Sequence, residues 1–351
     1  MPVIDAYIQY AIDNNASDLH ITVGKPPVLR VDGELVEMEN TAPLTPGTVA
    51  DMLLEIVPDQ RKDDLAKNGD VDFAYVALSN RLRANVYRQR GSYAAALRVL
   101  SKTIPTLDEL GHPAVLKNLA LLQRGLVLIT GPTGSGKSTT LAAMIDYANN
   151  TKTSHIITIE DPIEYLHRHK KCIINQRELN EDTLGFDLAL RAALREDPDI
   201  VLVGEMRDLE TVRAAITAAE TGHLVLSTLH TTGAASTVDR IIDVFPPSQQ
   251  PQVRIQLSET LQGVVSQQLL PRKERKGRIA ALEIMIKTDA ISNLVREGKS
   301  HQIENFIQTG RQYGMQMMDA HLAELVRTGT VDLKEARKKC VNLSAFERYL
   351  Q

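Results

Sequence analysis

The sequence predicts a two-domain α/β protein, in which an α+β domain is followed by an α/β domain with a largely parallel sheet and a helical extension. Segments in roughly the first 100 residues alternate apolar and polar side chains, which is typical of antiparallel strands with one exposed face. Beyond Arg124 the strand-like runs are uniformly apolar and alternate with helix-like segments, which is typical of a parallel sheet buried on both faces. The length of 351 residues also agrees with two domains of roughly 150 residues each.

The first domain is expected to span residues 1–100. It begins with a predicted helix over residues 3–15, whose apolar side chains recur on one face. Further helices are expected near residues 45–57 and 59–67. Alternating segments predict strands at 17–23, 26–38, 70–78 and 80–90, with turns at Val31-Asp32-Gly33 and Ser79-Asn80 and a following strand closed by Arg98.

A Pro- and Gly-containing segment, residues 101–112, is predicted to be a linker into the second domain, residues 113–351. A helix is expected at 113–123. Buried strands are predicted at 126–130, 155–159, 199–204 and 223–229, separated by helices that begin at Ser138, Phe186 and Leu209. One more strand-like run, at 278–286, and several amphipathic helices predict a mostly helical extension over residues 280–351.

Composition limits the classes of function. The net charge of −4 argues against a generic nucleic-acid binder, so no nucleic-acid partner is expected. The two cysteines, Cys172 and Cys340, form no pair motif, which suits a reducing compartment and predicts no zinc site. We find neither a signal-peptide pattern nor an apolar run of ~20 residues, and therefore expect a cytosolic protein that meets a membrane only through a partner.

The strongest functional signal lies at residues 131–139. The run Gly131-Pro132-Thr133-Gly134-Ser135-Gly136-Lys137-Ser138 fits the phosphate-binding pattern G-x-x-x-x-G-K-[ST] in full, and Thr139 follows it in the predicted site. Its glycines would let backbone N–H groups turn toward phosphate oxygens, Lys137 would pair with the β- and γ-phosphates, and Ser138 would bind Mg²⁺. A strand-like run precedes the motif and a helix-like run follows it, which disfavours a chance Gly-rich turn. The motif therefore predicts a site for ATP and Mg²⁺.

Polar residues follow three of the predicted strands, at the end where a parallel sheet places its ligand crevice. Glu205 is predicted to hold the Mg²⁺ shell through water. Glu164 is predicted to orient or deprotonate the attacking water, with Glu160 and Asp161 as alternatives. His230 could sense the γ-phosphate with support from His223, although a structural hydrogen-bonding role at a strand start explains His223 equally well.

Arginines form a second candidate set. Alternation places Arg81 and Arg83 on one strand face, and Arg98 closes the next strand. These residues could form an ordinary solvated face, or some of them could stabilise charge on the nucleotide. Arg191 and Arg195, one helical turn apart, would suit the same role across a subunit boundary.

The motifs, in this order, resemble those of the secretion-ATPase superfamily of RecA-like hexameric motors. GPTGSGKSTT resembles its Walker A loop, TIEDPIE its aspartate box, DPDIVLVGEMRD its Walker B motif and TAAETGHLVLSTLHTT its histidine box. ASDLH and RVDG resemble its N-terminal PAS-like domain. The resemblance covers essentially the whole chain and implies a PAS-like domain followed by a RecA-like P-loop NTPase domain.

Within the superfamily, the chain most resembles the type IV pilus retraction ATPases. It is short, it lacks the paired CxxC insertion of the assembly and type II secretion ATPases, and it carries TLDELG and RQYGMQMMD. AISNLVRE resembles the retraction motif AIRNLIRE, with Ser292 and Val295 as departures.

This resemblance implies a homohexamer with nucleotide at each subunit boundary. The ring would dock at the cytoplasmic face of the inner membrane on a platform protein and draw pilin subunits from the filament. A pilus-assembly or type II secretion ATPase, a RecA-like nucleic-acid translocase and a non-hydrolysing scaffold remain alternatives.

Overall fold

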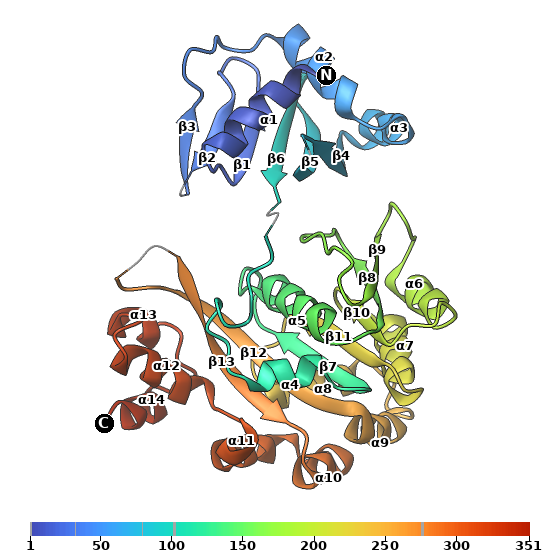
Figure 1. Ribbon diagram of the computed structural model, residues 1–351, viewed down its shortest axis with the longest axis vertical. Coiled ribbons are helices and arrows are strands. Elements are labelled where there is room, and N and C mark those ends of the chain that lie inside the picture. Colours follow the sequence, from blue (N-terminus) through green and yellow to red (C-terminus); the bar gives the residue numbers. More distant parts are fainter. Residues whose placement is uncertain (1, 32, 79, 101–102, 275–276) are drawn as a thin grey trace. The chain divides into compact units, whose positions relative to one another are not determined.

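The computed structural model describes residues 2–31, 33–78, 80–100, 103–274 and 277–351. The chain divides into two compact units, Met1–Thr103 and Ile104–Gln351, each with its own hydrophobic core (Figure 1). The predicted turns at 31–33 and 79–80 and the predicted linker at 101–112 include residues 32, 79 and 101–102, which lie outside the described part of the chain. Of the helices in the described ranges, none combines the length and the apolar character that crossing a bilayer requires.

The first unit is a six-stranded antiparallel sheet with helices packed on one face. The strand order is β3-β2-β1-β6-β5-β4. Its elements are α1 (Val3–Asp13), β1 (Asp18–Ile21), β2 (Val28–Val31), β3 (Glu34–Glu37), α2 (Pro46–Ile56), α3 (Asp59–Asn68), β4 (Asp70–Ala77), β5 (Asn80–Gln89) and β6 (Ser92–Val99).

Local sequence explains where the helices of this unit begin and end. Thr45 accepts a hydrogen bond from the backbone of Thr48 and Pro46 occupies the first turn, so α2 starts there. Gly69 ends α3 in the left-handed conformation that glycine favours. Apolar residues of α1 and α2, such as Ile8 and Leu53, pack on inward-facing strand residues to form the core.

The second unit is built on a seven-stranded sheet of order β13-β12-β7-β11-β10-β8-β9. The strands from β12 to β9 run parallel, and β13 is antiparallel to β12. The strands are β7 (Gly125–Thr130), β8 (His155–Glu160), β9 (Ile173–Glu178), β10 (Ile200–Val203), β11 (Leu224–Leu229), β12 (Leu261–Pro271) and β13 (Arg278–Ile286).

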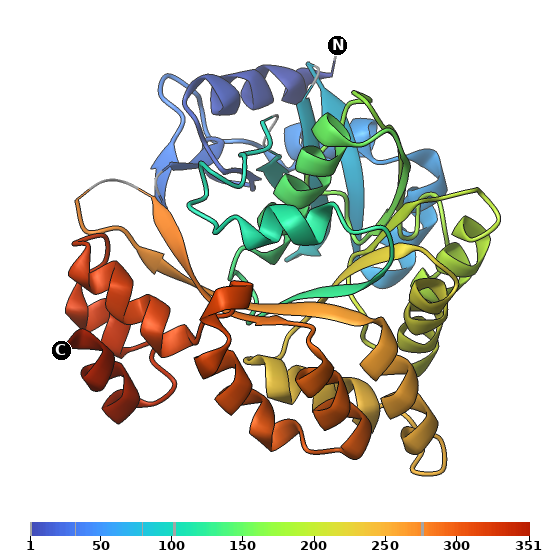
Figure 2. The same ribbon diagram turned by 60° about the horizontal axis from the view of Figure 1, so that its bottom comes forward.

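Helices cover both faces of this sheet, which explains why its central strands are mainly apolar (Figure 2). Val127 and Ile129 of β7 face a core shared with α4 (Val115–Ala120) and α5 (Lys137–Thr151). Leu126 and Leu128 face the opposite core. That core also contains residues of α6 (Phe186–Ala193), α7 (Leu209–Glu220), α8 (Ala234–Asp243), α9 (Gln250–Thr260), α10 (Asp289–Glu297) and α11 (Ile303–Thr309).

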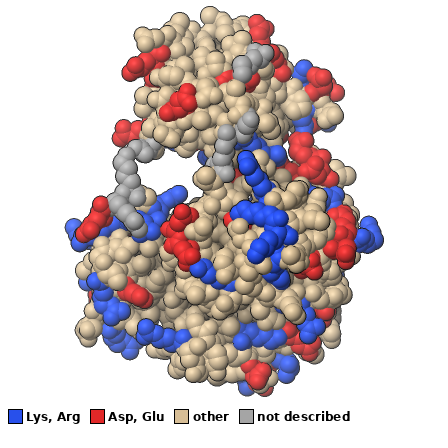
Figure 3. Space-filling view, in the orientation of Figure 1, with Lys and Arg blue, Asp and Glu red and all other residues tan. Residues whose placement is uncertain are grey.

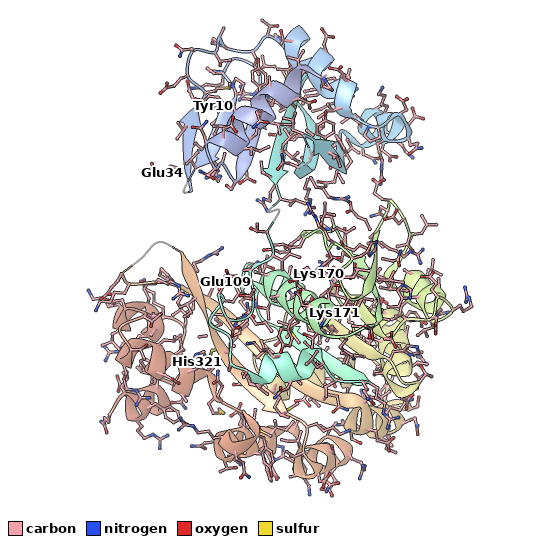
Figure 4. All side chains as sticks on the ribbon, in the orientation of Figure 1. Tyr10, Glu34, Glu109, Lys170, Lys171 and His321 are labelled. Atoms are coloured by element: carbon pink, nitrogen blue, oxygen red, sulfur yellow. The ribbon has the colours of Figure 1, made fainter. Side chains whose placement is uncertain are left out.

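The C-terminal helices attach to the β12–β13 hairpin. They are α12 (Met318–Arg327), α13 (Leu333–Arg337) and α14 (Leu343–Leu350), and short 3₁₀ turns at Ser300–Gln302 and Arg311–Tyr313 flank α11. His321, labelled in Figure 4, accepts a hydrogen bond at Nδ1 from the backbone N–H of Leu282 at 2.9 Å. Phe346 and Leu322 pack with Leu270 in a separate small core.

Two strands and two helices of the second unit were not anticipated from the sequence. β9 carries two uncharged polar residues and two charged ones (NQRE after Ile174), and β12 carries Gln262, Ser266, Gln267 and Gln268, so neither has the continuous apolar run of a buried strand. The helices α8 and α9 connect β11 to β12. The predicted helices at 113–123 and 186–196 are shorter than expected, because α4 ends at Ala120 and α6 at Ala193.

Candidate functional site

The phosphate-loop motif forms the turn between β7 and α5. Gly131, Gly134 and Gly136 all have positive φ angles, of 138°, 77° and 88°. A Cβ at Gly131 would lie 2.3 Å from the carbonyl oxygen of Gln267, and one at Gly136 would lie 2.8 Å from Nε2 of the same residue. At Gly134 a Cβ would meet open space. The loop therefore requires glycine at 131 and 136 for close packing as well as for backbone conformation.

Lys137 is the first residue of α5 and folds back over the loop. Its Nζ donates to the carbonyl oxygens of Gly131 and Pro132, at 2.9 and 3.1 Å. Burial lowers the pKa of Lys137, whereas the negative charges of Glu205 and Glu164 act to raise it. The lysine thus lies within the electrostatic influence of both predicted acids, at the positive end of a helix.

Two buried hydroxyl groups at the loop could hydrogen-bond to an anionic ligand. Among the described residues, the buried hydroxyls of Thr130 and Ser135 have no hydrogen-bond partner. Buried polar groups in proteins are nearly always hydrogen-bonded, so such a pair beside a phosphate-binding turn favours a bound group there. Ser138 is exposed in the first turn of α5, and Thr139 contacts the hydroxyl of Tyr165 at 3.0 Å.

Glu205 lies just beyond the carboxyl end of β10, where its carboxylate contacts two other side chains, one charged and one ionisable. Arg207 Nε lies 2.6 Å from Oε1, and His230 Nε2 lies 3.4 Å from Oε2. The structure therefore brings together Glu205 and His230, which the sequence predicted separately. The sequence prediction did not include Arg207, although it follows Glu205 by two residues in the same strand-end loop.

A pocket of about 410 Å³ opens beside this cluster. Its lining consists of Met206, Arg207, Leu229, His230, Thr231 and Arg240. Arg240, from α8, was also missed, because no local motif marks it. The pocket combines apolar walls with two guanidinium groups, a combination suited to an anionic organic ligand.

The candidate acids after β8 differ in their surroundings. Glu160 Oε1 accepts hydrogen bonds from the hydroxyl of Thr158 at 2.6 Å and from Nε2 of Gln176 at 3.0 Å. Burial raises the pKa of Glu160, and the nearby charge of Glu164 raises it further. Glu164 itself is exposed, as is Asp161. Glu160 is thus held in a structural network, while Glu164 is accessible to a water molecule.

The structure places His223 and His230 at opposite ends of β11 (Leu224–Leu229). His223 precedes β11 at its amino end, where its carbonyl accepts from Gly125 at the start of β7. The phosphate loop and His230 lie at the other end of this six-residue strand, roughly 20 Å away at ~3.3 Å per residue. Nδ1 of His223 instead lies 3.0 Å from the carbonyl of Ala218. β11 therefore places the two histidines at opposite edges of the sheet. A structural hydrogen-bonding role at the start of the strand explains His223.

The arginines Arg191 and Arg195 are not among the side chains around the phosphate loop of their own chain. Arg191 pairs with Glu210 at 3.0 Å, and Arg195 donates to the carbonyl of Arg191 at 3.4 Å. Both are exposed on or just after α6, on the chain that leads to the amino end of β10. A role for them across a subunit boundary remains a prediction.

In the first unit the predicted alternation of β5 is confirmed. Leu82, Ala84 and Val86 are fully buried, whereas Arg83 is exposed and Arg81 partly so. Arg83 lies directly opposite Arg98 of β6, and these two pair with Asp72 at 3.7 Å and Asp18 at 2.9 Å. On the face shown in Figure 3, basic and acidic side chains are interspersed over both units. Contact of Arg81, Arg83 or Arg98 with a nucleotide stays a prediction.

Two further residues outside the predicted set support the loop after His230. Ser266 of β12 accepts from the backbone N–H of Gly233 at 2.9 Å, and Glu283 of β13 accepts from that of Ala234 at 2.8 Å. The β12–β13 hairpin therefore fixes the start of α8, the helix that follows His230. Neither residue has a sequence signal, because each acts across the sheet.

A lysine folded over a glycine loop, with acids at the ends of neighbouring parallel strands, defines a P-loop ATPase. Residues 1–343 match the family described as "Type II/IV secretion system protein". The chain belongs to this family.

Individual relatives agree with this assignment. The chain is 52% identical over 337 residues to the type IV pilus retractation ATPase PilT of Pseudomonas aeruginosa, covering 96% of this chain and 97% of that protein. It is 49% identical over 318 residues to a twitching motility protein of Neisseria gonorrhoeae, covering 90% and 84%. The crystal structure of the pilus retraction motor PilT with bound ADP superposes with a TM-score of 0.93 at 49% identity, covering 98% of this chain and 99% of that one. The predicted fold class, with an N-terminal domain and a RecA-like ATPase domain, is confirmed.

Proposed function

We propose that this chain is an ATP-hydrolysing motor that retracts type IV pili. The observation that carries the proposal is the position of Lys137, buried over the phosphate loop and influenced by the charges of Glu205 and Glu164. Relatives that match nearly the whole chain are named as a retraction ATPase and a twitching motility protein, which supports pilus retraction as the task of this ATPase.

The described geometry supports a division of roles at the site. Lys137 and the N–H groups of the loop would hold the phosphates, and Ser138 and Glu205 would hold Mg²⁺, with Glu205 acting through water. The metal would supply positive charge to the phosphate oxygens. Glu164, being exposed, would orient and deprotonate the attacking water. His230, 3.4 Å from Glu205, would report the state of the γ-phosphate to the loop that starts α8.

The assembly and its partners follow from the resemblance. We propose a homohexamer in which Arg81, Arg83, Arg98, Arg191 or Arg195 complete the nucleotide site at a subunit boundary. The ring would act at the cytoplasmic face of the inner membrane on a platform protein, and so reach pilin subunits indirectly. A pilus-assembly or secretion ATPase and a nucleic-acid translocase are the competing functions.

A complementation experiment separates these functions. A strain that lacks the gene is expected to carry surface pili but to lose twitching, and the wild-type gene is expected to restore movement. Lys137→Ala should not restore it, because loss of the charged phosphate contact weakens ATP binding by about 10- to 100-fold.

Lys171→Ala provides the matched control, since it removes an exposed lysine of the same unit (Figure 4). This variant should twitch like the wild type. Bald cells in the deletion strain would instead indicate an assembly ATPase, and DNA-stimulated ATP hydrolysis by the purified protein would indicate a translocase.

A further inference from the structure

A glutamine from outside the phosphate-binding motif lies directly beneath the loop. Gln267 of β12 is 1% exposed. Its Nε2 donates to the carbonyl oxygen of Ser135 at 2.6 Å, and its Oε1 accepts from the hydroxyl of Thr140 at 2.9 Å. The same side chain and its backbone crowd Gly136 and Gly131. The loop is therefore folded over the amide of Gln267.

This contact determines the direction of one backbone donor. In a planar trans peptide, the C=O and the following N–H point in opposite directions. Because the carbonyl of Ser135 is held toward Gln267 in the interior, the N–H of Gly136 must point to the opposite side of the loop. That side is the solvent-facing one, where Pro132, Thr133 and Gly134 are exposed. A bound phosphate would approach from there.

A chain of hydrogen bonds holds the glutamine in this orientation. The hydroxyl of Thr140 donates its one hydrogen to Gln267, so His112 Nε2, 2.9 Å from the same hydroxyl, must be the donor to it. His112 Nδ1 is accordingly left without a partner among the described residues. Burial lowers the pKa of His112 to about 4, so this imidazole stays neutral near pH 7. The chain runs from His112 through Thr140 and Gln267 to Ser135, with every donor direction fixed.

We infer that Gln267 is a positioning residue for phosphate binding, which aims the Gly136 N–H at the nucleotide by anchoring the Ser135 carbonyl. The inference rests on the proposed nucleotide site and deepens it. Thr140 and His112 act through Gln267, since they fix which of its amide atoms faces the loop.

Calorimetric titration of the full-length protein with Mg-ADP tests the inference. Gln267→Leu removes the donor to Ser135, so the dissociation constant for ADP should rise about tenfold, the effect of one lost hydrogen bond to a charged group. Thr140→Val keeps the glutamine but removes the hydroxyl that orients it, and should raise the constant about threefold.

Gln268→Leu is the matched control. Gln268 is the same residue type in the next position of the same strand, but it donates to the carbonyl of Lys339 at 3.2 Å and not to the loop. Its dissociation constant for ADP should stay within about twofold of the wild-type value.

Adenosine, which carries no phosphate, separates positioning from a general structural effect. Its binding, followed by ligand-observed NMR, should be unchanged in Gln267→Leu and in Thr140→Val. The inference would be overturned if both variants bound ADP as tightly as the wild type. It would also be overturned if their affinities for ADP and for adenosine fell equally. If Gln267→Leu does not fold, Thr140→Val decides. Wild-type protein that binds no ADP would refute the proposed function itself, an outcome distinct from all of these.

Discussion

The two ends of strand β11 each carry a histidine, and the two side chains do different work. His230, at the carboxyl end, is 47% exposed at its side chain and shares Glu205 with Arg207. His223, at the amino end, directs Nδ1 to the carbonyl of Ala218 in the last turns of α7. One ring faces a pocket, and the other completes the end of a helix.

The same contrast extends along both edges of the sheet. At the amino edge, His155 has partners on both ring nitrogens, Asp197 and Asn175, and its backbone N–H donates to Asp199. At the carboxyl edge, buried hydroxyls of Thr130 and Ser135 have no partner among the described residues. In these examples the polar residue at the amino edge stabilises the fold, whereas the two hydroxyls at the carboxyl edge are left available for a ligand.

The largest expected effect is on ATP hydrolysis, when acids at the two edges of the sheet are replaced by their amides. Glu164→Gln and Glu205→Gln at the carboxyl edge should each lower the rate of ATP hydrolysis by about 10²- to 10⁴-fold, because the first removes the proposed base and the second a charge from the proposed metal shell. Steady-state ATPase assays of the purified protein measure this. Asp199→Asn at the amino edge, which alters an acid that accepts from His155, should keep turnover within about twofold. Wild-type turnover in both glutamine variants would refute the site assignment.

Replacing the two histidines that flank β11 is expected to have an intermediate effect on turnover. His230→Asn should lower turnover about tenfold, the contribution of one charge-assisted hydrogen bond in the transition state. His223→Asn should leave turnover nearly unchanged but lower the melting temperature, because its ring no longer reaches the carbonyl of Ala218. Parallel ATPase assays and thermal unfolding distinguish the pair. A turnover defect of equal size in both variants would contradict the different roles of the two histidines.

The smallest effect concerns Glu160, an acid at the carboxyl edge whose role is structural. Its pKa is raised by burial above the unfolded value of 4.5, so the native state holds the proton more tightly than the unfolded chain does. The stability from this group is therefore fully present below pH 4.5 and is lost as the pH rises through the raised folded value. Glu160→Gln cannot ionise, so its free energy of unfolding relative to wild type should increase with pH over this window. Urea unfolding at a series of pH values measures this difference in the free energy of unfolding. A difference that stays constant with pH would contradict the prediction.

The fold was predictable wherever the local pattern and the packing agree. The runs that became β7, β10 and β11 are mainly apolar and fully buried because helices cover both faces of the sheet. β12 escaped prediction because its polar residues, Ser266 and Gln267, hydrogen-bond to loops on opposite faces. Periodicity cannot distinguish such a strand from a loop, since its polar side chains are satisfied by distant parts of the chain.

Much of the candidate site was predictable for a similar reason. The phosphate-binding pattern is contiguous at residues 131–138, so the motif is readable from sequence alone. Arg207, Arg240 and Gln267 were missed because their roles arise from neighbours in space. For His223 the sequence left two roles open, and the contact of its ring with the carbonyl of Ala218 favours the structural one.

The three loop glycines also differ in what protein engineering could do with them. A side chain at position 131 would press on the backbone of Gln267 and displace β12, whereas one at position 136 would displace the amide group of the Gln267 side chain. At position 134 the surroundings are open and the φ of 77° is one that asparagine tolerates. An asparagine introduced at residue 134 would therefore lie at the mouth of the loop without pressing on Gln267.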